Sequence, residues 1–163
     1  MKAYTHDEMV NWYNNLPSKP VASSVVAWNN QGEILFVLSS KDEFWGLPGG
    51  IVEENEPPLA GACRELEEET GLKMYGGQLR LLGVNYAERL GEFRDFLHFY
   101  FSAGMLNTRD INRLGQASEK MHGCKFLSRH QISSHVAPHR LKAIENLFDS
   151  FNHDALYIET NHS

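Results

Sequence analysis

Three glutamates in the middle of the chain have the side-chain type and the spacing of a cation site. Glu65, Glu68 and Glu69 stand at positions i, i+3 and i+4, which places their carboxylates on one face of a helix. Like charges at this spacing repel one another, and the helix dipole disfavours acids near the C-terminal end. A bound cation would offset both costs, and hard oxygen ligands with room for water favour Mg²⁺ or Mn²⁺ over zinc. The alternative is a solvated acidic helix face.

The helix that must position these acids has recognisable ends. Pro57 and Pro58 suit its first turn, and Gly71 suits the left-handed position past its last turn. At roughly 100° per residue, one stripe of the helix is expected to meet the core. The stripe comprises Leu59, Ala62, Cys63, Leu66 and Thr70. Glu67 falls on the side opposite the three clustered acids, so we expect it to be solvated.

A pair of glycines and a further acid precede this helix. Gly49 and Gly50 allow the backbone to bend tightly and to bring a carbonyl near a metal or a phosphate. The complete pattern is Gly50, five residues, Glu56, seven residues, and then Arg-Glu-Leu-Glu-Glu-Glu-Thr-Gly-Leu over residues 64–72. This pattern resembles, without a departure, the signature box of the Nudix hydrolases.

The resemblance implies an enzyme that hydrolyses a nucleoside diphosphate linked to another group, X, with a divalent cation. Metal ions would bridge the phosphate oxygens to the glutamates and lower the pKa of a bound water. That water would attack a phosphorus in line. The implied metal ligands are Glu65, Glu68, Glu69 and the carbonyl of Gly49.

The resemblance also implies roles for Arg64 and for a general base. Arg64 would pair with Glu56 or orient a metal-binding glutamate, the alternative being a surface pair with Glu68. Families that share the box place the base differently. Glu65 is our prediction within the box, and Glu119 is the downstream candidate, with an ordinary loop acid as the alternative for Glu119.

Substrate recognition is expected from residues outside the helix. Phe44 and Trp45 stand before the glycine pair, and Tyr86 and Phe96 flank a loop at 87–92, so each is a candidate for stacking on a base. The cations that could meet phosphates are Lys41, Arg80, Arg89 and Arg94. Core packing is the alternative for the aromatic residues, and solvation is the alternative for the cations. His98, inside a strand, is expected to be packed or hydrogen-bonded.

The remaining elements predict an α/β fold of the Nudix type, an α/β/α sandwich with a central mixed sheet. Strands are expected at 21–28, 33–38, 78–86, 93–101, 122–127 and 155–158, with a short apolar segment at 51–52. The first two should form an antiparallel hairpin. A short amphipathic helix at 6–16 is expected to pack on the main body, 106–119 to form a polar loop, and 138–151 to form a last helix. These elements suggest a helical extension at 1–19 and a Nudix domain at 20–163.

Composition limits the classes of protein to consider. The chain has 163 residues, two cysteines and a formal net charge of −6, which suits one domain without a disulfide scaffold. Residues 53–69 hold seven acids and one base, whereas the rest holds 14 of each. We therefore expect a small-molecule nucleotide as partner, without broad nucleic-acid binding. With no secretory signal or membrane-spanning run, a cytoplasmic monomer or homodimer without membrane contact is expected.

Three functions remain open from the sequence. The leading one is hydrolysis, with nucleoside triphosphates as the favoured substrates and nucleotide sugars next. The second is a nucleotide-sensing module without turnover, against which the complete glutamate set argues. The third is a related prenyl diphosphate isomerase, which needs an active-site cysteine. Cys63 is expected on the core stripe instead, and Cys124 lies in a strand with no evident partner.

Overall fold

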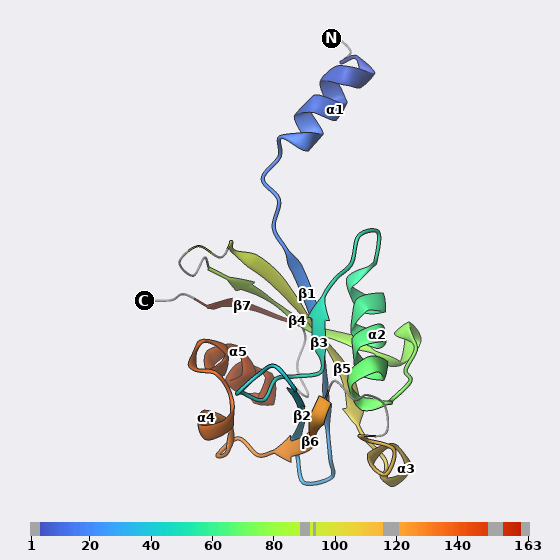
Figure 1. Cartoon of the computed structure of the whole chain (residues 1–163), viewed down its shortest axis with the longest axis vertical. Coiled ribbons are helices and arrows are strands. Elements are labelled where there is room, and N and C mark those ends of the chain that lie inside the picture. The colour runs from blue at the N-terminus through green and yellow to red at the C-terminus, as the bar shows by residue number, and fades with distance from the viewer. Residues whose placement is uncertain (1–3, 89–91, 93, 116–120, 150–154, 161–163) are drawn as a thin grey trace.

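A seven-stranded mixed sheet forms the centre of the molecule in the computed structural model, which describes residues 4–88, 92, 94–115, 121–149 and 155–160 (Figure 1). The strand order is β6-β2-β1-β5-β4-β7, and β3 pairs with β1 off this path. The strands are β1 (Val21–Trp28), β2 (Ile34–Ser39), β3 (Gly49–Ile51), β4 (Arg80–Ala87), β5 (Phe96–Met105), β6 (Met121–Leu127) and β7 (Leu156–Thr160). The strands predicted from the sequence are thereby confirmed, with small shifts at their ends.

The sheet combines parallel and antiparallel pairs. β1 runs parallel to β5 and β4 runs parallel to β7, whereas the β1–β2, β1–β3, β2–β6 and β4–β5 pairs are antiparallel. The parallel β1–β5 pair sets Ser24 opposite Tyr100, and the β1–β3 pair sets Ser24 opposite Gly49. β1 therefore joins the glycine pair to the middle of β5.

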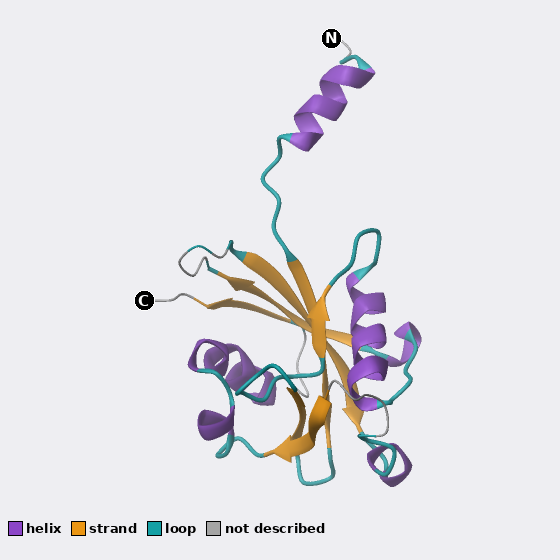
Figure 2. Ribbon diagram, in the orientation of Figure 1, coloured by secondary structure: helices purple, strands orange, loops and turns teal. Residues whose placement is uncertain are grey.

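Helices cover both faces of the sheet, as Figure 2 shows. The helices of the described residues are α1 (His6–Asn14), α2 (Pro58–Thr70), α3 (Thr108–Ile111), α4 (Ile132–His135) and α5 (Pro138–Asp149), with a 3₁₀ turn η1 (Gly76–Gln78). Neighbouring residues of β1 point to opposite faces. Val25 packs with Ala62 of α2, whereas Val26 belongs to the core that includes Ile144 of α5. The predicted α/β/α sandwich is confirmed.

Two short helices were not predicted from the sequence. α3 lies within the segment expected to be a polar loop, and α4 precedes α5. Each has four residues, which is too short to show a helical hydrophobic period. α3 depends on its cap instead, because the side chain of Asn107 accepts a hydrogen bond from the backbone N–H of Asp110 at 3.0 Å. No helix in the described ranges is long and apolar enough to cross a membrane.

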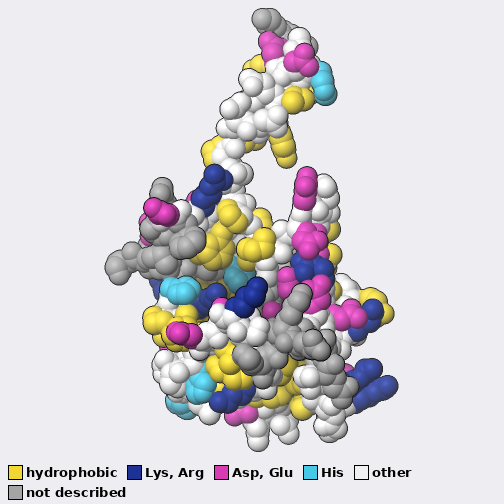
Figure 3. Space-filling model, viewed as in Figure 1, with side chains coloured by type: hydrophobic (Ala, Val, Ile, Leu, Met, Phe, Trp, Pro, Cys, Tyr) yellow, Lys and Arg dark blue, Asp and Glu magenta, His cyan; other side chains and the backbone are white. Residues whose placement is uncertain are grey.

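The N-terminal helix α1 forms as predicted, but the expectation that it packs on the main body was wrong. A capping box between Thr5 and Glu8 fixes its start, whereas no residue of α1 is buried. Trp12 is 65% exposed, and the helix stands away from the sheet with apolar side chains uncovered (Figures 1 and 3). The physical reason lies in the connection, where Pro17 and Pro20 favour an extended backbone.

Replacing the exposed aromatic residues of α1 should leave the stability of the folded body unchanged. We expect the double variant Trp12→Ala, Tyr13→Ala to change the free energy of unfolding by less than about 0.5 kcal/mol, because neither side chain is buried. Chemical denaturation of the full chain measures this. The comparison variant Leu66→Ala, at a fully buried position of α2, should lose about 3 kcal/mol. A loss of similar size in the double variant would show that α1 does pack on the body.

Candidate active site

The acidic cluster lies on α2, on the side of the helix that the core leaves open. Ala62, Leu66 and Thr70 are buried, as the predicted stripe required, and Gly71 ends the helix with a φ of 79°. Glu67 is exposed and pairs with Lys73 at 3.2 Å, which confirms its expected solvation. Acidic side chains gather over α2 and the loop before it in Figure 3.

The three clustered glutamates differ in burial. Glu68 is 59% exposed at its side chain, whereas Glu65 and Glu69 are half-buried. The backbone N–H of Gly49 donates to Glu69 Oε2 at 2.8 Å. Burial nevertheless raises the pKa of Glu69 to about 7, and the negative charges of Glu65, Glu68 and Asp42 add to this rise. The carboxylates are therefore close enough to repel one another.

Removing the charge of Glu69 should stabilise the metal-free protein. Folding raises the pKa of this carboxyl from 4.5 to about 7. Ionisation of Glu69 therefore lowers the free energy of unfolding, and this loss grows as the pH rises across that interval and is constant above it. We expect the free energy of unfolding of Glu69→Gln to exceed that of wild type by about 1–2 kcal/mol at pH 8 in EDTA, and to equal it at pH 4. Denaturation at the two pH values measures the difference. A less stable variant at pH 8 would contradict the burial of this charge.

Arg64 links the acidic cluster to the segment before the helix. Its Nε and Nη2 donate to the two carboxylate oxygens of Glu56 at 2.9 and 3.0 Å, and its Nη1 donates to Glu65 Oε1 at 2.8 Å. The guanidinium holds the pKa of Glu56 at about 2. The contact with Glu68 is looser, at 3.7 Å. Arg64 thus pairs with Glu56, as the resemblance implied, and also contacts the clustered Glu65.

The glycines of β3 hold the backbone close to its neighbours. A Cβ on Gly49 would overlap the carbonyl oxygen of Ser23 and the side chain of Ser24. A Cβ on Gly50 would lie 2.8 Å from Glu65 Cδ and nearer still to Oε1. Glycine at both positions therefore brings the β3 backbone against the clustered carboxylates.

The donor set suits a hard divalent cation, but the site must rearrange to hold one. Carboxylates and a backbone carbonyl are the ligands that Mg²⁺ and Mn²⁺ prefer. In the part of the chain that the structure describes, no three acidic, histidine or cysteine side chains stand ready to ligate a metal. Glu65 is bonded to Arg64, and Glu69 is bonded to the Gly49 N–H. A cation would compete with these partners for the same oxygens.

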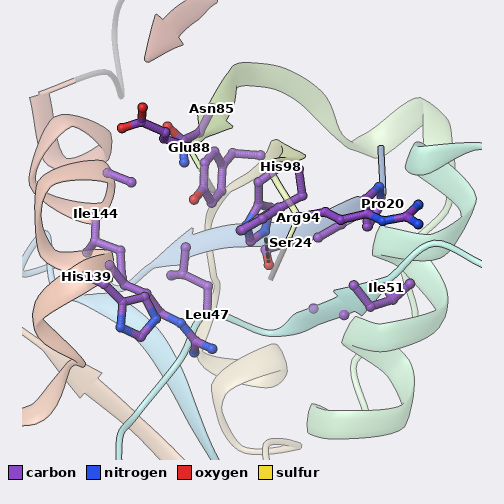
Figure 4. A pocket seen from close by; sticks show the side chains of 17 residues that line it. Pro20, Ser24, Leu47, Ile51, Asn85, Glu88, Arg94, His98, His139 and Ile144 are labelled. Atoms are coloured by element: carbon purple, nitrogen blue, oxygen red, sulfur yellow. Dashed lines mark hydrogen bonds between the residues drawn. The ribbon is translucent and has the colours of Figure 1, made fainter. Parts of the chain in front are cut away.

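A cavity of about 660 Å³ opens beside the glycine pair. Its walls come from β1, β3, β4, β5 and α5, and Figure 4 shows His139 and Ile144 of α5 facing it across from Ser24 and Ile51. The lining residues are Pro20, Ala22, Ser24, Leu47, Gly49, Gly50, Ile51, Asn85, Glu88, Arg94, Phe96, His98, Tyr100, His139, Arg140, Ala143 and Ile144. A volume of this size is typical of small-molecule sites.

His98 forms part of the cavity wall. Its Nε2 lies 2.8 Å from Ser24 Oγ, and its ring stacks on Tyr100 with centroids 4.3 Å apart. Burial and the positive charge of Arg140 lower the pKa of His98 to about 3, so its imidazole is neutral at physiological pH. The expectation that His98 is packed and hydrogen-bonded is confirmed, and its place in the cavity is additional.

The structure separates the residues that we considered for substrate contact. Arg94 and Phe96 line the cavity. Phe44 and Trp45 do not, since Phe44 is 43% exposed and Trp45 packs on the core beneath α5. Two further candidates, Arg89 and Glu119, lie outside the described residues.

Several cavity residues were missed from the sequence. His98 and Tyr100 alternate with the predicted candidate Phe96 along one strand, and a period of two predicts that the three rings share a face of the sheet. That signal was available in the sequence. The contributions of Asn85 and Arg140 come from distant elements, and no local pattern marked them.

Comparison with known proteins identifies the family. The sequence model of the NUDIX domain matches residues 18–147, most of the chain. The chain belongs to the Nudix hydrolase family. The RNA pyrophosphohydrolase of Rhizobium meliloti is 24% identical to this Nudix protein over 161 residues, covering 85% of this chain and 96% of the relative. The RNA pyrophosphohydrolase of Halorhodospira halophila is 32% identical over 98 residues, which cover 60% of this chain and about half of the relative, 48%.

Solved structures share the fold. The Nudix domain of Shewanella oneidensis NrtR, complexed with ADP ribose, superposes with a TM-score of 0.66 at 16% identity, covering 88% of this chain and 96% of that one. A UDP-X diphosphatase superposes with a TM-score of 0.66 at 19% identity, covering 96% of this chain and 76% of that one. These likenesses confirm the sandwich fold of this Nudix hydrolase.

Proposed function

We propose that this protein hydrolyses a diphosphate bond in a nucleoside diphosphate linked to X, with Mg²⁺ or Mn²⁺ as the cation and water attacking phosphorus. One observation carries the proposal. The cavity reaches Gly49 and Gly50, and these same residues contact Glu69 and Glu65. A ligand in the cavity would therefore meet the acidic cluster at the β3 backbone.

The residues of the signature box would divide the work. Glu65, Glu68 and Glu69, with the carbonyl of Gly49, would hold the cation. The cation would supply charge neutralisation for the phosphates and a lowered pKa for an attacking water. Arg64, bonded to Glu56 and Glu65, would orient Glu65. Gly50 and Gly71 keep the structural roles that the box implies, close approach and helix termination.

Glu65 is our candidate for the general base within the box. It is half-buried, stands beside the Gly50 backbone at the cavity edge and has an oxygen held by Arg64. An oriented carboxylate can accept a proton from water when the two are within hydrogen-bond reach. Glu119 remains the alternative base from a later segment.

The nucleoside part of the substrate would occupy the cavity. Phe96, His98 and Tyr100 offer ring faces along one wall, and aromatic faces stack on bases without strict sequence preference. Arg94 stands at the cavity with only a weak contact, 3.4 Å from Ser18 Oγ, and would meet a phosphate. Phe44, Trp45 and Arg89 stay predictions for further substrate contacts.

The test is a substrate panel with Mg²⁺. Nucleoside triphosphates, dinucleotides and nucleotide sugars are incubated with the protein, and the products are separated to show which phosphorus was attacked. We expect hydrolysis of at least one of these substrates, with loss of turnover in EDTA. Activity that is unchanged in EDTA, or no hydrolysis of any substrate, would overturn the proposal.

A triphosphate at an RNA 5′ end is a second candidate substrate. It is favoured by the similarity to the Rhizobium meliloti RNA pyrophosphohydrolase, which extends over 85% of this chain. The chemistry and the roles of the box residues would be the same. A 5′-triphosphorylated oligonucleotide, compared with the free nucleoside triphosphate of the same first base, separates the two substrates by their kcat/KM values.

The other functions considered from the sequence receive less support. Cys63 and Cys124 are half-buried, burial raises the pKa of both thiols, and neither lines the cavity, which argues against the isomerase. A sensing module would bind nucleotide without turnover, as calorimetry would reveal. A cytoplasmic location, a monomeric or homodimeric state and a domain boundary between residues 19 and 20 stay predictions.

A further inference from the structure

Arg140 is a cation on the cavity wall whose charge no side chain in the described ranges takes up. It stands in the first turn of α5 and lines the cavity. Arg64 and Arg129 form ion pairs with carboxylates. By contrast, the side chain of Arg140 makes no hydrogen bond or ion pair with a described residue. A guanidinium offers five donors in a fixed fork that fits phosphate or carboxylate.

The guanidinium lies close to the segment that leads into the glycine pair. A Cβ on Gly46 would stand 3.3 Å from Arg140 Nη1. Gly46 is itself fixed, because its N–H and its carbonyl both bond to the backbone of Val37, at 2.9 and 2.8 Å. The small residue at this position leaves room for the guanidinium three residues before Gly49.

Arg140 is exposed to solvent where it lines the cavity, and its charge acts across the cavity. It acts on two residues of the opposite wall, since it lowers the pKa of His98 and opposes the rise that burial causes in the pKa of Tyr100. The cavity therefore has an acidic boundary, where Gly49 and Gly50 contact the clustered glutamates, and a basic boundary at Arg140.

We propose that Arg140 binds an anionic group of the substrate in addition to the diphosphate held at the acidic cluster, so that the site selects nucleoside triphosphates over nucleotide sugars whose X is neutral. This inference rests on the proposed function. A third phosphate would accept charge-assisted hydrogen bonds from the guanidinium. A neutral sugar would displace water from the guanidinium without pairing its charge, so the free-energy cost of desolvating that charge would not be offset.

The kinetic test compares Arg140→Gln with wild type on two substrates, GTP and UDP-glucose, with Mg²⁺. We expect the variant to lose about 10- to 100-fold in kcat/KM for GTP and less than about threefold for UDP-glucose. Arg140→Lys, which keeps the charge and loses the fork, should recover part of the loss. Lys142→Gln is the matched control, because Lys142 is exposed on the same helix and does not line the cavity.

A binding test separates this inference from the proposed function. Inorganic tripolyphosphate is titrated into the full chain in EDTA, and affinity is measured by calorimetry for wild type, Arg140→Gln and Lys142→Gln. We expect only Arg140→Gln to weaken binding, by about tenfold or more. Equal affinities for all three proteins, or equal losses of kcat/KM on GTP and UDP-glucose, would overturn the role of Arg140. Absence of hydrolysis with every substrate would instead contradict the proposed function, while tripolyphosphate binding would still test Arg140.

Discussion

Glu68→Gln is expected to lower kcat by about 10³-fold while the fold stays intact. Glu68 is 59% exposed at its side chain, and its contact with Arg64 Nη1 is loose, at 3.7 Å, so the substitution removes little packing. It removes a negative charge from the proposed cation site, and neutral amide oxygen is a weaker ligand for a hard cation than carboxylate. Steady-state kinetics at saturating Mg²⁺, with circular dichroism to verify folding, provide the measurement.

Glu67→Gln is the matched control for Glu68→Gln. It makes the same chemical change one residue earlier on the same helix, but Glu67 points to solvent and pairs with Lys73. We expect its kcat to stay within about twofold of wild type, because Glu67 lies away from the three clustered acids. The fold should also be kept, because an exposed pair of this kind contributes little to stability. If both variants kept full activity, the acidic cluster would not be the catalytic site. If both variants lost activity equally, the loss of one negative charge anywhere on α2 would explain the effect, and the position of Glu68 would not.

Alanine at the adjacent Gly49 and Gly50 should have two different effects, a loss of stability in the first variant and a loss of activity in the second. In Gly49→Ala, the new Cβ meets backbone, the Ser23 carbonyl oxygen and Ser24 Cα at 2.6 Å, so the β1–β3 pairing must break. We expect a loss of about 3 kcal/mol in the free energy of unfolding. In Gly50→Ala, the new Cβ meets only the end of the Glu65 side chain, which can rotate away. That variant should fold with nearly normal stability and lose about 10²-fold in kcat, because Glu65 is displaced.

Gly77→Ala serves as the control for both glycine variants. Nothing lies within 4 Å of a Cβ built at Gly77. The free energy of unfolding should therefore change by less than about 0.5 kcal/mol, and kcat by less than about twofold. Denaturation midpoints and kcat are measured for all three variants. A stable Gly49→Ala protein would contradict the close packing of β3 against β1. Full activity in Gly50→Ala would show that Glu65 takes no part in the reaction.

Much of the candidate site could be predicted from the sequence because it is local. Positions on one helix fix which side chains share a face, so the grouping of Glu65, Glu68 and Glu69 and the exposure of Glu67 followed from spacing alone. The start and end of α2 were likewise set by proline and by Gly71, whose φ of 79° is the conformation that glycine favours. The pairing of Arg64 with Glu56 came from the family resemblance and was confirmed by two hydrogen bonds.

The substrate side of the site could not be obtained in this way. The cavity depends on β1 lying parallel to β5, which brings Ser24 and His98 together across 74 residues of chain, and on α5 covering that face. Hydrophobic periodicity indicates that a strand has a buried face, but it does not indicate which strand lies beside it. Phe44 and Trp45 were therefore considered for substrate contact, whereas Arg140 and Asn85 were not.

The N-terminal helix shows the same division between local and tertiary information. The capping box of Thr5 and Glu8 and the spacing of apolar residues determined that α1 forms. Its partner, by contrast, depends on where the extended connection directs it. The sequence by itself thus determined the longer helices and the acidic face of α2, because these follow from neighbours within a few residues. Only the tertiary structure decided the cavity, its basic wall and the separation of α1, because contacts between distant segments arise from strand order and packing.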